Sequence, residues 1–362
     1  MTVLALLFSF SAKADVLPRE KGEPASAFAA RVKSWKEIPQ PVSANLARFV
    51  AAYPAEIVAV EAEEDKKPVL IHLRNGAKPV FEDFDKKGFE QMLANADVNE
   101  MIVQVYPREL EGKSWPENLD PGRFRSTEFL KGVYGSSEEE VRKNLTSVPF
   151  CGNKVTFNKR NGASAALAAV GKELEALAEK KPELKRHLKP LGGTFNWRQV
   201  AGTENLSAHS FGVAIDLNPA FGSYWRWDKK GSLGDMARRT AYPEAIVKVF
   251  ERHGFIWGGK WYHFDMMHFE FRPEFQGSNA YVGNGPGEDV QSIAAGEGMP
   301  KPLTIYPRED EKAPPAEKAS TNPTPGAKKP SKASEAPATA EPSSADKQGA
   351  PESAPVPIAP RK

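Results

Sequence analysis

Four polar side chains with metal-binding or acid–base chemistry lie in two short stretches of the sequence. The stretch SAHSFGVAIDLNP contains His209 and Asp216, and the stretch WYHFDMMHFEF contains Asp265 and His268. Two imidazoles and one carboxylate form a normal catalytic zinc shell, which leaves a fourth position open for water. Hydrolysis also needs a carboxylate that contacts this water without binding the metal, and Asp265 is a candidate for that role.

Both stretches have the pattern of short strands, in which alternate side chains face opposite sides. Asp216 follows an apolar run, where a carboxylate needs a partner or a metal to offset its desolvation. His268 and Glu270 fall on one face of the second strand, and Asp265 stands three positions before His268. From the residues alone, ion pairs on an edge strand are an open alternative to a metal site.

The order and context of these residues resemble a known pattern. SAHSFGVAID followed by WGGKWYHFDMMHFE is similar to the S-x-H-x-x-G-x-A-x-D … D/E-x-x-H pattern of the D-alanyl-D-alanine carboxypeptidase-like (VanY-type) zinc peptidases. The resemblance covers roughly Val148–Pro273, and the upstream GGTFNWRQVAGT also fits. It implies an α+β chain with the hedgehog/D,D-peptidase fold, in which helices flank an antiparallel sheet. It also implies Zn2+ as cofactor and a peptidoglycan stem peptide as substrate.

The resemblance assigns roles residue by residue. It implies three zinc ligands: His209, Asp216 and His268. It makes Asp265 the general base and later the general acid, and it makes Arg198 the cation that faces the developing oxyanion or the substrate carboxylate. Ser207 matches the serine before the first ligand, where it either contacts substrate or hydrogen-bonds its own turn. Glu270 is expected to orient a ligand. The pattern does not use His263 as a ligand.

The identity of the base bears on the branch of the family. The carboxypeptidases and the D,D-dipeptidase commonly carry glutamate where this chain has Asp265. Aspartate with the WGG-W lead-in favours the L-alanyl-D-glutamate endopeptidase branch, and a D-Ala-D-Ala carboxypeptidase is the alternative. A non-catalytic zinc-containing module of the same fold, which binds cell wall or signals, is a second hypothesis. Asp265 argues against it, because a purely structural zinc needs no nearby base.

The elements that must position these residues can be predicted from periodicity. The stretch NGASAALAAVGKELEALAEK has an apolar stripe at helical spacing. AYPEAIVKVFERHGF predicts a second helix, with Pro243 near its start and Gly254 at its end. TFNWRQV, FGVAIDL, GFIWGG and HFEFRP have the composition of short strands. This mixture predicts an α+β domain with an antiparallel sheet.

Residues 15–147 carry no chemical signature. Apolar and polar residues alternate on both sides of Asn75-Gly76, which predicts a hairpin with a tight turn. DKKGFEQMLANA and SSEEEVRKNLTSV predict helices, the latter capped by Ser136 or Ser137. We expect a small N-terminal α+β region of unknown role, which is either a separate domain that binds cell wall or a prodomain that covers the site.

The whole chain limits the function classes. A formal net charge of +2 over 362 residues gives no sign of a dedicated nucleic-acid binder. The single cysteine, Cys151, excludes an internal disulfide and a multi-cysteine zinc site, and it is expected to be a small core residue. The sequence does not indicate an oligomeric state.

The two ends of the chain differ in composition from the rest. Residues 1–14, MTVLALLFSFSAKA, resemble a signal peptide, although the missing positive n-region leaves an upstream start open. We therefore expect an exported protein, periplasmic or extracellular, with no integral membrane segment in its mature form. The zinc peptidase domain is expected at 148–285 and a linker at 286–305. The Pro-, Ala- and Lys-rich residues 306–362 are expected to be a disordered tail.

Overall fold

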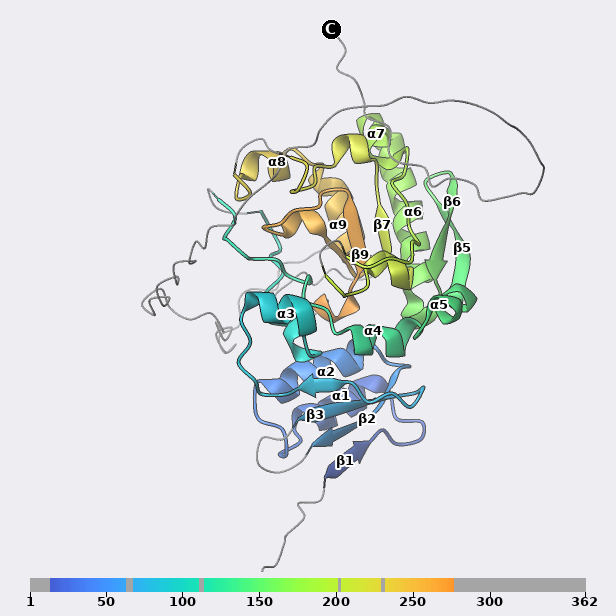
Figure 1. Ribbon diagram of the computed structural model, residues 1–362. Coiled ribbons are helices and arrows are strands. Elements are labelled where there is room, and N and C mark those ends of the chain that lie inside the picture. Colours follow the sequence, from blue (N-terminus) through green and yellow to red (C-terminus); the bar gives the residue numbers. More distant parts are fainter. Residues whose placement is uncertain (1–13, 63–67, 111–113, 201–202, 229–231, 277–362) are drawn as a thin grey trace, which may run out of the picture. The chain divides into compact units, whose positions relative to one another are not determined.

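The structure, a computed structural model, divides into two units, Met1–Pro307 and Arg308–Lys362. It describes these residues: 14–62, 68–110, 114–200, 203–228 and 232–276 (Figure 1). All of them belong to the first unit. The predicted linker 286–305, the predicted tail 306–362 and all but the last residue of the predicted signal peptide lie outside the described residues.

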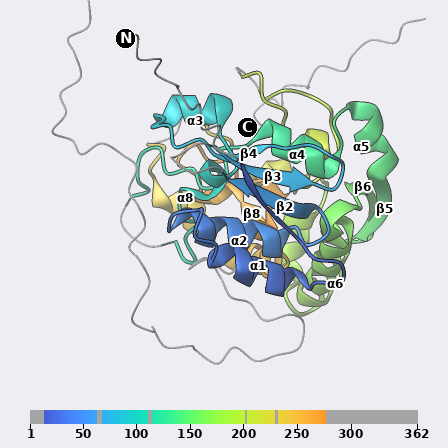
Figure 2. The same cartoon turned by 90° about the horizontal axis from the view of Figure 1, so that it is seen from below.

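The N-terminal region begins with a four-stranded antiparallel sheet. Its strands, in order across the sheet, are β1 (Asp15–Pro18), β2 (Ile57–Ala62), β3 (Val69–Leu73) and β4 (Val80–Glu82). The predicted hairpin is confirmed, because β3 pairs with β4 and Gly76 takes a positive φ of 89° in the connection. In Figures 1 and 2, α1 (Ala25–Lys33) and α2 (Val42–Ala52) lie beside β2 and β3.

Three further helices complete the N-terminal region. They are α3 (Phe89–Asn95), α4 (Thr127–Tyr134) and α5 (Glu138–Asn144). The prediction of helices in DKKGFEQMLANA and SSEEEVRKNLTSV is confirmed. Ser137 is the residue that caps α5, since its side chain accepts a hydrogen bond from the backbone N–H of Glu140. Ser126 caps α4 in the same way, through the N–H of Phe129.

A tight hairpin connects the two parts of the sequence. Strands β5 (Leu145–Phe150) and β6 (Asn153–Asn158) are antiparallel, and Cys151 and Gly152 turn the chain between them with positive φ angles. Cys151 is buried, as expected of a core residue. Burial raises the pKa of its thiol to about 12, and the nearby Glu175 carboxylate adds to this shift. The thiol therefore stays protonated and unreactive at neutral pH.

Helices pack around the hairpin and a second sheet. They are α6 (Ala163–Lys180), α7 (Lys185–Leu188), α8 (Met236–Thr240) and α9 (Glu244–Arg252). The two long helices were predicted, and α6 packs on β5, β6 and α9 while α9 packs on β8. Short 3-10 turns join the elements: η1 (Asn99–Ile102), η2 (Arg160–Gly162), η3 (Pro182–Leu184), η4 (Ala208–Phe211), η5 (Pro219–Phe221), η6 (Gly258–Lys260) and η7 (Pro273–Phe275).

The second sheet has three antiparallel strands in the order β7-β9-β8. They are β7 (Ala214–Asp216), β8 (Phe255–Trp257) and β9 (His268–Phe271). Three of the four predicted strands of this part are confirmed. The strand predicted at TFNWRQV is wrong: the segment forms only one isolated bridge, between Gln199 and Leu206, and Gly193 just before it forms another with Asp216. Its backbone groups bond instead to the turn around His209.

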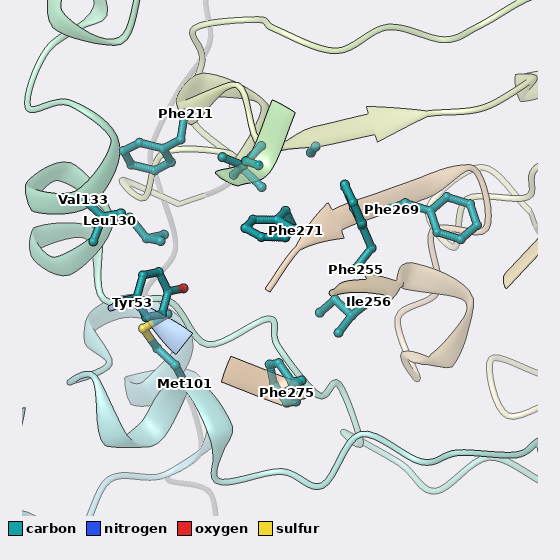
Figure 3. Close-up of a cluster of buried hydrophobic side chains, with 14 of the residues drawn as sticks. Tyr53, Met101, Leu130, Val133, Phe211, Phe255, Ile256, Phe269, Phe271 and Phe275 are labelled. Carbon is teal, nitrogen blue, oxygen red and sulfur yellow. The ribbon is translucent and has the colours of Figure 1, made fainter. Parts of the chain in front are cut away.

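One hydrophobic core runs through both parts of the sequence. Figure 3 shows side chains from before residue 148 beside side chains of the second sheet, and all belong to one buried cluster. Tyr53 is fully buried, packs edge-on against Phe129, and donates a hydrogen bond to Glu274 at 2.8 Å. The chain is thus an α+β protein with antiparallel sheets and packed helices. Among the described residues, none of the helices has both the length and the apolar character of a membrane span.

Candidate active site

Three side chains from distant parts of the sequence converge at one end of the second sheet. Nε2 of His209 lies 3.1 Å from Nδ1 of His268 and 3.2 Å from Oδ1 of Asp216. The same Nδ1 and Oδ1 atoms are 3.0 Å apart. The structure therefore brings together the three residues that the sequence pattern indicated as ligands, with one donor atom of each at the corner of a triangle.

This triangle fits a tetrahedral zinc ion. With zinc–ligand distances of about 2.0–2.2 Å, the edges of a regular tetrahedron measure about 3.3–3.6 Å. The three donor atoms are only a few tenths of an ångström closer to one another, a difference that small rotations of the side chains remove. Two imidazole nitrogens and one carboxylate oxygen are also the donor set of catalytic zinc sites, which keep one position for water or substrate.

The turn η4 presents His209. Ser207 precedes it and accepts a hydrogen bond from the His209 backbone N–H, while Gly212 closes the turn in the left-handed conformation. The ring is fixed as well, because its Nδ1 donates to the backbone carbonyl of Thr194. That bond places the proton on Nδ1 and directs the Nε2 lone pair toward Asp216 and His268.

The register of the second sheet places the other two members. Asp216 on β7 is the direct partner of His268 on β9. The neighbouring pair, Ile215 and Phe269, is fully buried in the core on the opposite face. The alternation that buries these two apolar side chains therefore turns Asp216 and His268 toward the same side.

Glu270 orients the ring of His268 through a hydrogen bond to its Nε2 atom. Oε2 of Glu270 accepts a hydrogen bond from Nε2 of His268 at 3.1 Å, which leaves Nδ1 to face the other two members. The carboxylate is fully buried and is held by two guanidinium groups, Arg125 at 2.6 Å and Arg272 at 2.9 Å. Burial alone would raise the pKa of Glu270, but Arg125, His268 and Arg272 outweigh it and hold the pKa below its ordinary value.

The electrostatics of the site favour a cation. Burial alone would lower the pKa of His268, but hydrogen bonds to Asp216 and Glu270 outweigh it and raise the pKa to about 10. For Asp216, burial is outweighed by His209 and His268, so its pKa lies below the ordinary value. The carboxylates that stabilise a positive imidazole here would also stabilise a divalent metal ion.

Part of the sequence matches a known protein family. Residues 201–271 match the family model of D-alanyl-D-alanine carboxypeptidase. The matched stretch contains His209, Asp216, Asp265 and His268, and it supports the resemblance to this peptidase family without selecting a branch. No curated protein and no solved structure matches the chain.

Asp265 lies beside the three converging side chains. Its backbone N–H donates to Gly258 and its carbonyl accepts from the N–H of His268, so the residue is fixed against the sheet. Its Oδ1 atom is buried and has no hydrogen-bond partner among the described residues. Burial raises the pKa of Asp265 to about 6, and the negative charge of Asp216 adds to this, although His268, His209 and Arg198 oppose it. A buried carboxylate oxygen without a partner is a suitable acceptor for a water at the site.

Arg198 and Ser207 differ in their exposure to solvent. Arg198 is exposed and forms no ion pair among the described residues, yet it is close enough to lower the pKa of Asp265. Its guanidinium faces solvent and donates one hydrogen bond, to the backbone carbonyl of Gln199. Ser207 is buried, and its hydroxyl caps the turn that carries His209, which was the alternative to substrate contact.

His263 bonds to Asp120 and is not one of the three converging side chains. Its Nδ1 pairs with Oδ2 of Asp120 at 2.7 Å, and its backbone N–H donates to the other oxygen of the same carboxylate at 2.9 Å. Phe89 and Trp225 pack on its ring. The partner Asp120 lies in the N-terminal region, as does Arg125, and sequence reasoning missed both. No local pattern marks either residue, because each acts across more than 140 positions of the chain.

Proposed function

We propose that this protein is a zinc-dependent peptidase that hydrolyses peptidoglycan stem peptides. The observation that carries the proposal is the triangle of donor atoms of His209, Asp216 and His268, with sides of 3.0–3.2 Å. The buried Oδ1 of Asp265 beside it, which has no hydrogen-bond partner within the described ranges, supports an enzyme rather than a structural zinc site. The match of residues 201–271 to a peptidase family also supports a peptidase.

Each residue has a distinct part in the proposed reaction. His209, Asp216 and His268 would hold a zinc ion, which would act as a Lewis acid toward a water and the scissile carbonyl. Asp265 takes the proton from the attacking water and delivers it to the leaving amine. Arg198 stabilises the negative charge that develops on the carbonyl oxygen or binds the substrate carboxylate. Ser207 keeps the first ligand in place, because its hydroxyl caps the turn that carries His209.

The bond that is cut defines the branch of the family. Aspartate at position 265 and the WGG-W lead-in favour cleavage between L-Ala and D-Glu, and the alternative is removal of the terminal D-Ala. An exported protein meets this substrate in the cell wall, which agrees with the signal-peptide pattern of residues 1–14. Fractionation of cells that produce the full chain should place it in the periplasm or outside the cell, and a purely cytoplasmic location would contradict the export proposal.

A muropeptide digest tests the proposed activity. Purified full-length protein is incubated with defined muropeptides, with and without a chelator, and the products are identified by mass spectrometry. Cleavage after L-Ala indicates an endopeptidase, and loss of D-Ala indicates a carboxypeptidase. Both should stop with chelator and return with added zinc. Protein that holds zinc but cuts neither bond would reject the enzyme and favour a non-catalytic wall-binding module.

Two histidines five positions apart provide a matched pair of variants for the metal site. His268→Ala should abolish stoichiometric zinc binding, because it removes one of three ligands. His263→Ala should keep zinc binding, because His263 pairs with Asp120 instead. Zinc content after dialysis separates the two. Equal zinc loss in both variants would contradict the assigned ligand set.

A further inference from the structure

A segment of the N-terminal region lies along the strand that carries His268. We call Leu119–Arg125 the clasp segment. Its backbone carbonyls accept hydrogen bonds from the residues around the site: Leu119 from the N–H of Tyr262, Pro121 from the indole of Trp261, and Gly122 from Arg272. Two of its side chains reach residues next to these, Asp120 to His263 and Arg125 to Glu270. The clasp segment precedes the stretch that matches the peptidase family.

Gly122 allows this close approach. Its φ is +92°, which side-chain-bearing residues rarely adopt, and a Cβ atom there would stand 2.3 Å from Cδ1 of Ile256. Only glycine fits a backbone that combines this conformation with this contact. The clasp segment is therefore built against β8 and the residues that follow it, and its last residue, Arg125, is held in a fixed place.

Arg125 acts on one particular oxygen of Glu270. Its Nη2 donates to Oε2 at 2.6 Å, and this is the oxygen that accepts the bond from Nε2 of His268. Arg272 binds the other oxygen, Oε1, at 2.9 Å. Of the two cations, Arg125 is thus the one that orients the acceptor for His268.

The arrangement is more than an ordinary ion pair between two parts of a chain. Glu270 is fully buried and the Arg125 side chain is 12% exposed, so both charges are largely removed from water. The Nε–H of Arg125 is also buried without a partner among the described residues. Burying a guanidinium with an unused donor is unfavourable for stability, which points to a role at Glu270 beyond holding the chain together.

We infer that Arg125 is a positioning residue of the metal site, acting through Glu270 to fix the ring of His268. The inference rests on the proposed function, because it assigns His268 to the metal. The hydrogen bond from Nε2 to Glu270 fixes the tautomer and the plane of the ring, so that the Nδ1 lone pair faces the metal position. The N-terminal region then contributes to the metal site of the proposed peptidase and is not a prodomain that merely covers it.

A second ion pair, partly buried, supplies a matched control, although its Arg160 side chain is 28% exposed against 12% for Arg125. Nη2 of Arg160 lies 2.6 Å from Oε2 of Glu56, the same separation as in the Arg125–Glu270 pair. This pair also joins the N-terminal region to the rest of the chain, but it has no connection to His268. Arg160→Met and Arg125→Met each remove one guanidinium and keep an apolar stem of similar length.

The test measures metal binding by the full-length protein. Zinc dissociation constants are obtained by competition with a coloured chelator, and Co2+ absorption spectra report the ligand geometry. Arg125→Met should raise the zinc dissociation constant toward the loss of about 10–100-fold that is typical when the hydrogen-bond partner of a metal ligand, here Glu270, is removed, and it should alter the cobalt spectrum. Arg160→Met should change the constant less than about threefold. Arg125→Lys, which keeps the charge, should fall between Arg125→Met and the natural protein.

A double-variant measurement tests the path of the effect. Because Arg125 acts through Glu270, Arg125→Met should weaken zinc binding little further in a Glu270→Gln background. Additive losses would show that Arg125 acts by another route and would overturn the inference. If Arg125→Met gives no cooperative thermal transition, the comparison is made with Arg125→Lys and Arg160→Lys, and the same order is expected.

The other outcomes are also decisive. An unchanged zinc constant and cobalt spectrum in Arg125→Met overturn the inference, as does an equal loss in Arg125→Met and Arg160→Met. A natural protein that binds neither zinc nor cobalt removes the proposed function itself, whatever the variants do. Metal binding by the natural protein therefore distinguishes the two failures. If the natural protein binds zinc, the variants test the inference alone; if it does not, the proposed function fails.

Discussion

Asp216 and His268 are direct cross-strand partners on β7 and β9, and their side chains meet at 3.0 Å. The next pair along the ladder, Ile215 and Phe269, is fully buried on the other face. A shift of one residue between these strands would send Asp216 into the core and an apolar side chain into the site. The hydrophobic core thus fixes the register, and the register assembles the site.

Replacing Asp265 by asparagine should separate catalysis from metal binding. Asp265→Asn keeps the shape of the side chain but removes the proton acceptor, so kcat for muropeptide cleavage should fall at least about 100-fold. Zinc content and the melting temperature should stay close to those of the natural protein, since Asp265 is not one of the three proposed ligands. Rates from a chromatographic assay and zinc content by atomic absorption are measured on the same preparation.

A comparison with glutamate sharpens this assignment. Asp265→Glu restores a carboxylate on a longer stem, and it should recover part of the activity that Asp265→Asn loses. If Asp265→Asn cleaved at the natural rate, another group would be the base. If it lost its zinc, Asp265 would belong to the ligands instead.

Gly122 is the position where the clasp segment is most sensitive to a side chain. Gly122→Ala places a Cβ 2.3 Å from Cδ1 of the buried Ile256 and adds strain at a positive φ. Gly76 has a similar φ of +89° but open space around it. Gly76→Ala should therefore cost about 1–2 kcal/mol of unfolding free energy, and Gly122→Ala about 1–3 kcal/mol more.

Urea unfolding of the two alanine variants checks this difference. In a Gly122→Ala background, Ile256→Val removes the clashing methyl group, so the double variant should be more stable than the sum of the single effects. Equal losses for Gly122→Ala and Gly76→Ala would mean that the chain relaxes around the new methyl group, contrary to the close packing of Gly122 on Ile256.

Local patterns predicted the parts of the fold that local physics determines. The apolar stripe of α6 and the Pro243 and Gly254 boundaries of α9 mark these helices in the sequence, because helical spacing and end residues are short-range properties. The strands β7 and β9 follow from alternation. The prediction at TFNWRQV was wrong, although its composition suits a strand. Its backbone groups bond to the turns around it, and only the fold decides which partner they meet.

The residues that hold the candidate site in place from the N-terminal region could not be predicted from local patterns. His209, Asp216 and His268 were found because they lie in patterned segments. Arg125 and Asp120 stand in a stretch without periodicity and meet their partners about 145 and 143 positions away. Such contacts leave no trace in local spacing, since they depend on how the N-terminal region packs on the second sheet.

Removal of the N-terminal region should disrupt the fold as well as the site. A fragment that begins at Val148 loses Tyr53 and Tyr106, which are buried and donate hydrogen bonds to the buried Glu274 and Glu251. It would expose the apolar surface that Figure 3 shows packed between both parts. We expect this fragment to bind a hydrophobic dye and to melt without a cooperative transition.

Removal of the second unit provides the comparison. A chain that ends at Pro307 lacks Arg308–Lys362, which form a separate unit. It should melt cooperatively at the same temperature as the full chain. A fragment from Val148 that melted as sharply as this shortened chain would show that the part from Val148 onward folds alone.

Asp97 should make stability depend on pH. Burial raises its pKa from the ordinary 3.8 to about 8, with the Glu100 and Glu82 carboxylates adding to the shift and Lys87 opposing it. Between about pH 4 and pH 8 the folded state keeps this proton while the unfolded chain has lost it. The folded state then binds more protons, so the contribution of Asp97 to stability falls as pH rises through this window.

Asp97→Asn should flatten this dependence. The amide cannot ionise, while its oxygen can still accept the bond that the Glu100 N–H makes to Asp97. The urea midpoint of the natural protein should therefore fall more between pH 5 and pH 8 than the midpoint of Asp97→Asn. Asp85→Asn removes a carboxylate from an exposed position and should retain the natural slope. Parallel curves for the natural protein and Asp97→Asn would mean that Asp97 is already ionised in the folded state at pH 5.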